Sequence, residues 1–259
     1  MSGLKRNQMV SFYKKYYHPR NAVLFISGNF NKDTIKKTIK KYFDKEVKTK
    51  EIPFPKAKIK MDGPNILLSK RNVKETHFVI GFNMFDSNDK RNPVATVLDG
   101  ILSNGFNSRL YLNVREKLGG AYYVTSGISR FYDRSIFSIS AGVNSGKSKE
   151  ILKEIINELK ILKTDLVPEK ELNKIKNRIV NATIMNMDNS YNITRYVDWA
   201  ILGKRKMKSP KQFVDEILNV TAQDVKNLSN LIFIPENIKM GIVSAKNLKK
   251  DFKDIIKNI

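Results

Sequence analysis

Cysteine is absent from the 259-residue sequence, and histidine is rare, with only His18 and His77. Without cysteine the chain can form no disulfides, no thiolate metal sites and no cysteine nucleophile. A zinc site would need histidine and carboxylate ligands, and neither histidine stands in H-x-x-E-H or H-x-x-H spacing. The sequence therefore predicts no metal ligands and no bound cofactor on this chain, and no catalytic residues that act from this chain alone.

Long hydrophobic runs are also missing. The longest apolar stretches, such as residues 22–26, are far too short to span a bilayer. The N-terminus has no hydrophobic core of the kind that a secretory signal contains. We therefore expect a soluble, cytoplasmic protein without a membrane partner.

Acidic residues are few, because 25 Asp and Glu stand against 48 Lys and Arg, which gives a net charge of +23. Such a charge can indicate a nucleic-acid partner. The basic residues are mostly lysines spread along helical stretches, and no recognisable nucleic-acid-binding motif accompanies them. Solvated lysine faces explain this pattern better. A nucleic-acid partner is the less favoured alternative.

Hydrophobic residues make up 41% of the chain, enough for a folded core. Two similar stretches lie near its ends. Near the start, a helical pattern ends at a Pro-Arg-Asn break at 19–21, and an apolar run over 22–28 that predicts a strand and a helix over 32–43 follow. The same order recurs around the Pro-Glu-Asn break at 235–237. The breaks are about 216 residues apart, the spacing of a domain, which indicates a tandem repeat.

The repeat divides the chain into three parts. Residues 1–45 are expected to be the C-terminal tail of a preceding homologous domain, so that the chain is expected to start inside a longer protein. Residues 46–64 carry three prolines and no helical period, which predicts an extended linker. Residues 65–259 are expected to form a complete second domain.

Within 65–259 most strand patterns come first and helices follow, which favours an α+β layer over an alternating parallel α/β fold. Gly119 and Gly120 are expected to end a short helix before a strand begins. Strands are expected over 66–69, 76–85, 121–131, 135–143 and 238–243, and helices over 93–102, 109–117, 148–163, 168 onward and 224–231.

Several motifs resemble those of insulinase/pitrilysin-type zinc metallopeptidases, the group that includes mitochondrial processing peptidase. Residues 98–110 read LDGILSNGFNSRL and residues 114–124 read VREKLGGAYYV. The stretch FYKKYYHPRN at 12–21 resembles the end-of-domain signature of that family, and ELNKIK at 171–176 resembles a helix that comes later in the domain. Together these motifs cover most of the chain.

The resemblance implies a LuxS/processing-peptidase-like domain, with an antiparallel sheet covered by helices. It also implies two homologous halves that face each other like a clamshell, with zinc and the H-x-x-E-H helix in the other half. In the half without zinc, the family places an Arg and, seven residues later, a Tyr that reach the peptide near the scissile bond. Those positions are Arg115 and Tyr122 here.

A phenol or a guanidinium beside a carbonyl oxygen stabilises the negative charge that builds on that oxygen during peptide hydrolysis. The residues alone leave another interpretation open. An Arg at a helix end commonly balances the helix dipole, and a strand Tyr commonly belongs to the core. A hairpin that turns at residues 132–133 would put Tyr122 opposite Val143, on the face of Phe137, Ile139 and Ala141.

We therefore expect the non-zinc, substrate-binding half of a zinc metalloendopeptidase. It would be inactive alone and would need a zinc-bearing homologous half, in the same longer chain or in a separate subunit, to hydrolyse peptides. A degenerate relative with a structural role also fits the missing motif. The main alternative is a non-catalytic scaffold subunit of the same fold, and a basic nucleic-acid-binding protein is the third.

Overall fold

A computed structural model describes residues 3–43, 57–58, 65–203 and 205–259. The predicted linker at 46–64 lies outside the described residues except for 57–58. The backbone amide of Ala57 donates a hydrogen bond to the Asp133 carboxylate at 2.7 Å.

The sheet at the centre of the fold has five strands in the order β1-β5-β2-β4-β3. The pairs β2–β4, β2–β5 and β3–β4 are antiparallel, as expected, whereas β1 joins the edge of the sheet parallel to β5. The α+β class is thus confirmed, with a mixed sheet. The strands are β1 (Asn65–Lys70), β2 (Glu75–Met84), β3 (Ala121–Arg130), β4 (Ser135–Asn144) and β5 (Ile238–Ser244).

One face of the sheet is buried. Alternate residues of β2 point into the core, and Phe78, Ile80 and Phe82 are at most 1% exposed. Phe233 packs edge-on against Phe82 and Phe137, with ring centres 5.0 Å and 5.5 Å apart. Complete burial of each such ring contributes about 1.5–3 kcal/mol, so this aromatic cluster joins the sheet firmly to the helix that ends beside Phe233.

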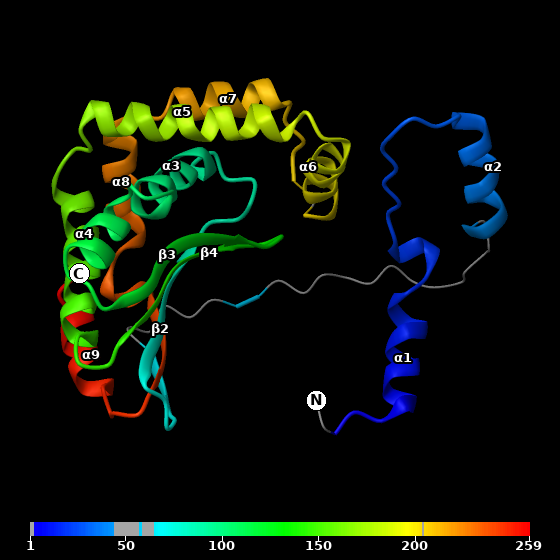
Figure 1. Cartoon of the computed structure of the whole chain (residues 1–259). Coiled ribbons are helices and arrows are strands. Elements are labelled where there is room, and N and C mark those ends of the chain that lie inside the picture. The colour runs from blue at the N-terminus through cyan, green and yellow to red at the C-terminus, as the bar shows by residue number, and fades with distance from the viewer. Residues whose placement is uncertain (1–2, 44–56, 59–64, 204) are drawn as a thin grey trace.

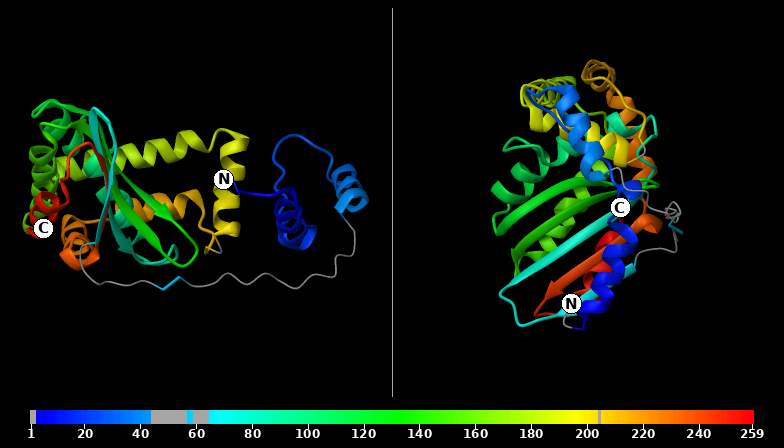
Figure 2. Two further views of the ribbon diagram at one scale, coloured as in Figure 1. Left: turned by 90° about the horizontal axis from the view of Figure 1, so that it is seen from below. Right: turned by 90° about the vertical axis from the view of Figure 1, so that its right-hand side faces the viewer.

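Helices cover the buried face in two layers, and α6 lies beyond the ends of α5 and α7 (Figure 1). The helices α3, α4, α8 and α9 lie next to the strands, and α5 and α7 run side by side above α3. In the right-hand view of Figure 2 the strands stand in front of these helices, so the other face of the sheet is the open one. The helices are α3 (Asn92–Ser103), α4 (Ser148–Thr164), α5 (Glu169–Asn186), α6 (Ser190–Leu202), α7 (Pro210–Leu218), α8 (Ala222–Ile232) and α9 (Lys249–Ile256).

Local chemistry explains where several of these helices begin. The Ser209 hydroxyl and the Gln212 side chain bond reciprocally to the backbone at the start of α7, and Thr221 and Asp224 do the same for α8. The Asn189 side chain accepts from the Tyr191 amide at the start of α6. These caps fix the residues at which α6, α7 and α8 begin.

The N-terminal part contains α1 (Arg6–Tyr16), the short helix η1 (Pro19–Asn21) and α2 (Lys32–Phe43), and it stands apart from the sheet (Figure 1). The strand expected over 22–28 is not formed there, although the order helix, 3-10 turn, extended segment and helix recurs in α8, η3 (Pro235–Asn237), β5 and α9. A strand needs a neighbouring strand to bond with, and no ladder partner lies beside 22–28 in the described chain.

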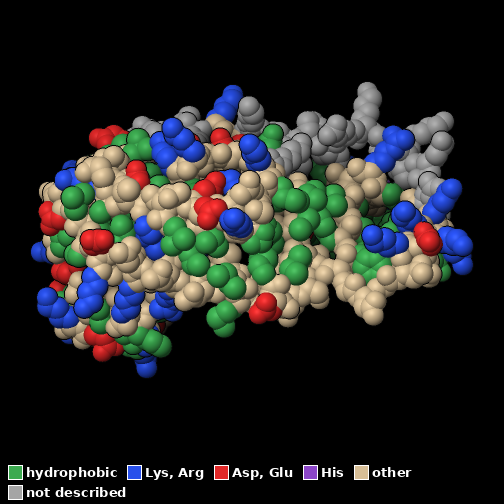
Figure 3. Space-filling view, turned by 90° about the horizontal axis from the view of Figure 1, so that it is seen from above, with side chains coloured by type: hydrophobic (Ala, Val, Ile, Leu, Met, Phe, Trp, Pro, Cys, Tyr) green, Lys and Arg blue, Asp and Glu red, His purple; other side chains and the backbone are tan. Residues whose placement is uncertain are grey.

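Charged side chains are scattered over the surface. Figure 3 shows Lys and Arg side chains distributed over one face of the molecule, with Asp and Glu between them. Hydrophobic side chains gather in the middle of the same face, around the end of α5 and along α6, where Met185, Tyr191 and Leu202 are more than half exposed. Within the described residues, no helix is long and apolar enough to cross a membrane.

Candidate functional site

The two residues that the resemblance singles out lie on either side of a glycine turn. Arg115 is exposed near the end of η2 (Tyr111–Glu116), a short helix with π-type hydrogen bonding. Gly119 and Gly120 follow with φ of 60° and 84°, a conformation that residues with a Cβ rarely adopt. The chain then enters the edge strand β3, where Tyr122 is 57% exposed.

The expected position of Tyr122 on the core face is wrong. The register of β3 against β4 shifts between Ala121 and Tyr123, which pair with Val143 and Gly142, so Tyr122 is the extra residue of a β-bulge. A bulge re-aims the side chain that it carries. Ala121 takes the buried position instead, and the phenol of Tyr122 faces solvent.

The structure brings Arg115 and Tyr122 to the same end of the edge strand but does not join them. Among the described residues, no hydrogen bond or ion pair links the two side chains. The Arg115 guanidinium lies 5.2 Å from the centre of the Tyr111 ring, which is its nearest recorded aromatic contact. Both side chains are therefore accessible to a ligand from outside the chain.

A buried polar cluster holds η2 in place. The Arg109 guanidinium donates to both carboxylate oxygens of Glu171 at 2.8 and 2.9 Å, and Glu158 lies 3.8 Å away. Asn113 donates to Glu158 at 2.6 Å. Burial raises the pKa of Glu158, although the bond from Asn113 and the charge of Arg109 oppose this shift. The cluster ties the Arg115 helix to α4 and α5.

The turn after η2 is anchored as well. Lys147 donates from its ammonium group to the Leu118 carbonyl at 2.6 Å, and the Asn144 amide donates to the Gly120 carbonyl at 2.8 Å. A Cβ at Gly120 would lie 2.9 Å from the Lys147 side chain. The path from Arg115 to Tyr122 is thus fixed by the end of β4, which gives both side chains a defined position.

Sequence reasoning did not identify two residues on the open face near this turn. The Tyr123 hydroxyl lies 3.2 Å from His77 Nδ1, and the two rings are nearly parallel with centres 6.1 Å apart. They meet across Gly142 of β4, the strand between them. A hollow of about 360 Å³ opens beside them, with Leu67, Val79 and Val243 among its lining residues. Tyr123 and His77 are far apart in the sequence, and only the register in which β2, β4 and β3 pair brings them together.

A metal site is not found here. Among the described residues, no group of three or more His, Asp or Glu side chains is placed to hold a metal ion. His77 has one carboxylate nearby, Glu75 at 3.5 Å, and a phenol as its other neighbour. This set does not fit a catalytic zinc, which takes three protein ligands.

Two curated relatives match most of this chain. A protein of Rickettsia bellii (strain RML369-C) that is named an uncharacterized zinc protease is 27% identical over 246 residues, which cover 94% of this chain and 58% of the relative. The uncharacterized zinc protease YmxG of Bacillus subtilis (strain 168) is 24% identical over 246 residues, with 94% and 59% covered. The chain thus spans less than two thirds of the length of these relatives.

Solved structures share the fold. A protease from Helicobacter pylori matches with a TM-score of 0.83 at 22% identity, over 93% of this chain and 60% of that one. A peptidase M16 inactive domain from Pseudomonas fluorescens gives 0.75 at 19% identity, over 95% and 59%. A chain of complex III2 from Candida albicans gives 0.77 at 15% identity, over 98% and 63%.

The family model described as the peptidase M16 inactive domain matches residues 3–179, more than half of the chain. The motifs around Arg115 and Tyr122 lie inside this match. The chain therefore belongs to the M16 family of insulinase/pitrilysin-type metallopeptidases and carries the inactive domain of that family.

Proposed function

We propose that this chain is the substrate-binding half of an M16-type zinc metallopeptidase and that it cleaves peptides only together with a zinc-bearing homologous half. The observation that carries the proposal is the placement of Arg115 and Tyr122. Both are exposed, they lie at one end of an edge strand, and an anchored glycine turn fixes the path between them.

The chemistry that these two residues offer is hydrogen bonding to a peptide carbonyl oxygen. A guanidinium and a phenol that are already in position lower the energy of an oxygen that gains negative charge, because they need little reorganisation during the reaction. Neither group is committed to another partner by a hydrogen bond within the described residues. Zinc, held by the other half, would supply the metal-assisted chemistry.

The N-terminal part supports the need for a homologous half. Val23, Leu24 and Ile26 are 49%, 55% and 41% exposed in a segment that corresponds by element order to the strand β5. We infer that residues 1–45 complete the sheet of a preceding homologous domain, as β5 completes the sheet of residues 65–259. The match between the two ends of the chain argues for a two-domain unit.

A reconstitution assay tests the proposal. The purified chain is mixed with a homologous M16 half that contains H-x-x-E-H, and cleavage of a fluorogenic peptide is measured. We expect no cleavage by this chain alone and measurable cleavage by the mixture. Arg115→Ala and Tyr122→Phe should each lower kcat/KM by about 100- to 1,000-fold, the cost of losing one such donor.

Two matched control variants test whether a loss of cleavage is specific to Arg115 and Tyr122. Arg71→Ala removes an exposed arginine at the far edge of the sheet, and Tyr191→Phe removes an exposed phenol on α6, so neither should change cleavage by more than about twofold. If the halves bind each other but cleavage does not appear, the scaffold alternative is favoured. If cleavage appears and the Arg115 and Tyr122 variants lose nothing, the assigned roles are wrong.

A further inference from the structure

A second cavity lies away from Arg115 and Tyr122, between the start of α3, the end of β3 and the helices α5, α6 and α7. Its volume is about 320 Å³, which is the lower end of the range for pockets that hold small molecules. Much of its wall is apolar, with Pro93, Met187, Trp199, Ala200 and Phe213 among its lining residues.

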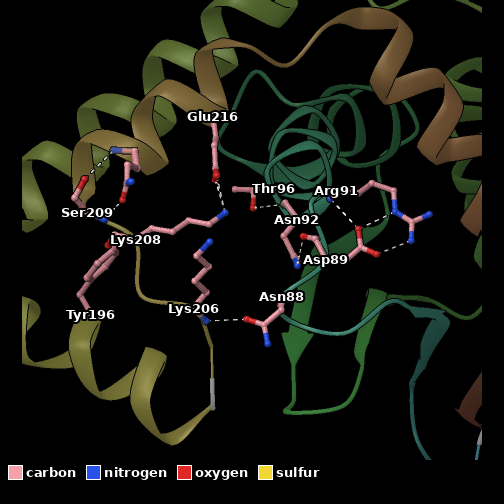
Figure 4. A network of polar contacts seen from close by, with 11 residues as sticks. Asn88, Asp89, Arg91, Asn92, Thr96, Tyr196, Lys206, Lys208, Ser209 and Glu216 are labelled. Carbon is pink, nitrogen blue, oxygen red and sulfur yellow. Dashed lines mark hydrogen bonds and ion pairs between the residues drawn. The ribbon is translucent and has the colours of Figure 1, made fainter.

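The polar part of the wall is strongly basic. Among the described residues, four cations line the cavity, and the single acid that lines it is Glu216. Both carboxylate oxygens of Glu216 lie 2.7 Å from the ammonium of Lys208, so this acid is already paired (Figure 4). In Figure 4 the side chain of Lys206 points toward the same pair. The other cations are Arg130 and Arg205.

Neither arginine has an Asp or Glu oxygen within ion-pair distance among the described residues. Arg130 donates to Asn92 at 3.3 Å and to Thr96 at 2.8 Å, both neutral acceptors. Arg205 donates from Nη2 to the Arg130 carbonyl oxygen at 3.1 Å. Burial and the charge of Arg130 lower the pKa of Arg205 to about 10, so the Arg205 side chain remains positive at neutral pH. Burial also lowers the pKa of Arg130, and the charge of Asp99 opposes that shift.

Some donor groups of this cavity wall do not use their hydrogen-bonding capacity within the described residues. Nε and Nη1 of Arg205 and the hydroxyl of Ser87 are buried and have no hydrogen-bond partner in the part of the chain that the structure describes. Buried polar groups without partners destabilise the fold, and charged ones do so most. An anion in the cavity, with a small movement of the Arg205 side chain toward it, would satisfy these donors and reduce the repulsion between the two arginines.

Trp199 forms an aromatic part of the cavity wall. The Arg205 guanidinium stacks on the indole ring at 3.3 Å, and Arg130 lies 5.9 Å from the ring centre. An apolar wall beside stacked guanidinium groups favours an anion that carries a hydrophobic body over a bare inorganic ion. The planar fork of an arginine also matches the geometry of a carboxylate.

We propose that this cavity binds a small organic carboxylate with an apolar body, its carboxylate held by Arg205 and Arg130 and its apolar part against Trp199 and Phe213. The C-terminal residue of a peptide and a free hydrophobic acid share this chemistry. The proposal does not depend on the peptidase function, because it involves other residues and can be measured without cleavage.

Trp199 makes the test direct, because it is the only tryptophan in the sequence and its fluorescence reports on this cavity. The full chain is titrated with N-acetyl-phenylalanine and with its neutral amide. We expect a saturable change in tryptophan emission with the acid and at least tenfold weaker binding of the amide. A tripeptide with a C-terminal phenylalanine distinguishes the sources: binding as tight as that of the capped amino acid indicates a peptide end, and weaker binding indicates a free acid.

Arg205→Gln should weaken binding of the acid by about 10- to 100-fold, the loss expected for hydrogen bonds to a charged group. Arg71→Gln, at an exposed arginine outside the cavity, should leave binding unchanged. Circular dichroism checks that each variant is folded, and Arg130→Lys serves as a second variant. Equal binding of acid and amide, tighter binding of inorganic phosphate than of the acid, or no saturable change with the wild-type chain would overturn the proposal.

Discussion

At the scale of single residues, Gly142 allows the contact between Tyr123 and His77. A Cβ at Gly142 would lie 2.3 Å from Tyr123 Cε1 and 3.0 Å from His77 Nδ1. Such distances are well inside van der Waals contact, so the tyrosine ring can cross β4 only above a residue without a side chain. Gly142 therefore determines how Tyr123 and His77 pack on the open face next to the candidate site.

The first prediction is that Gly142→Ala lowers the free energy of unfolding by about 1 kcal/mol or more, because the new methyl group displaces the Tyr123 ring from His77. Gly127→Ala is the matched control on the same sheet, since nothing lies within 4 Å of a Cβ there. That change should be neutral or stabilising by about 0.5 kcal/mol, because alanine is less flexible than glycine in the unfolded chain.

Urea denaturation of both variants measures these differences. The double variant Gly142→Ala/Tyr123→Ala should lose less than the sum of the single changes, because the clash is then removed. An unfolding free energy of Gly142→Ala equal to that of the wild type would show that the ring moves aside without cost.

At the same scale, the sequence predicts only part of the candidate site. The Arg-to-Tyr spacing and the Gly119-Gly120 turn are visible in the sequence, and both glycines adopt positive φ as expected. The bulge at Tyr122 could not be predicted, because simple alternation assumes one residue opposite one residue. The cavity beside Trp199 was also beyond prediction, because its arginines come from β3 and from the segment before α7, 75 residues apart.

At the scale of elements, the close crossing of α3 and α5 depends on Gly100. A Cβ at this position would lie 2.6 Å from Ile175 Cγ2 and 3.4 Å from Ile179 Cδ1. The aspartate before it, Asp99, accepts a hydrogen bond from the Ser126 hydroxyl at 2.5 Å, which ties the same turn of α3 to β3. Helix α3 is thus held between the strand and the outer helical layer.

The second prediction uses this crossing. An alanine in a helix interior is favoured over glycine by about 1 kcal/mol, whereas overpacking a core costs about 1–3 kcal/mol. Gly100→Ala should therefore be destabilising in the wild type. In a chain that also carries Ile175→Ala, which removes Cγ2, the same change should be neutral or stabilising. A double-mutant cycle by chemical denaturation checks the reversal of sign, and an additive result would contradict the packing account.

The elements themselves were largely predictable from periodicity. The strands expected over 76–85 and 135–143 correspond to β2 and β4 within one residue at each end, because their alternating apolar residues cover a single core. The helix expected over 109–117 is formed over 109–116, and its segment Tyr111–Glu116 has π-type hydrogen bonding. The strand expected over 22–28 is absent because its apolar pattern has no sheet to join within the described chain.

At the scale of the whole molecule, the hydrophobic core belongs to one part of the chain. Every buried hydrophobic residue in the described structure lies between Ile66 and Ile256, and α1 and α2 bury none. The Ser27 hydroxyl joins the N-terminal part to the rest by donating a hydrogen bond to the Ser190 carbonyl at 2.9 Å. The energetics of folding should therefore reside in residues 65–259.

The third prediction follows from this distribution. A chain of residues 65–259 should unfold within about 10 °C of the full chain, because the hydrogen bonds that are lost, those made by Ser27 and Ala57, are exposed and each corresponds to about 1 kcal/mol or less. The full chain should bind more of a hydrophobic dye and self-associate more than the shortened chain, since Val23, Leu24 and Ile26 are exposed only in the former. Calorimetry and light scattering measure both differences. A large fall in melting temperature on truncation would mean that the N-terminal part is integral to the fold, and it would contradict its assignment to a neighbouring sheet.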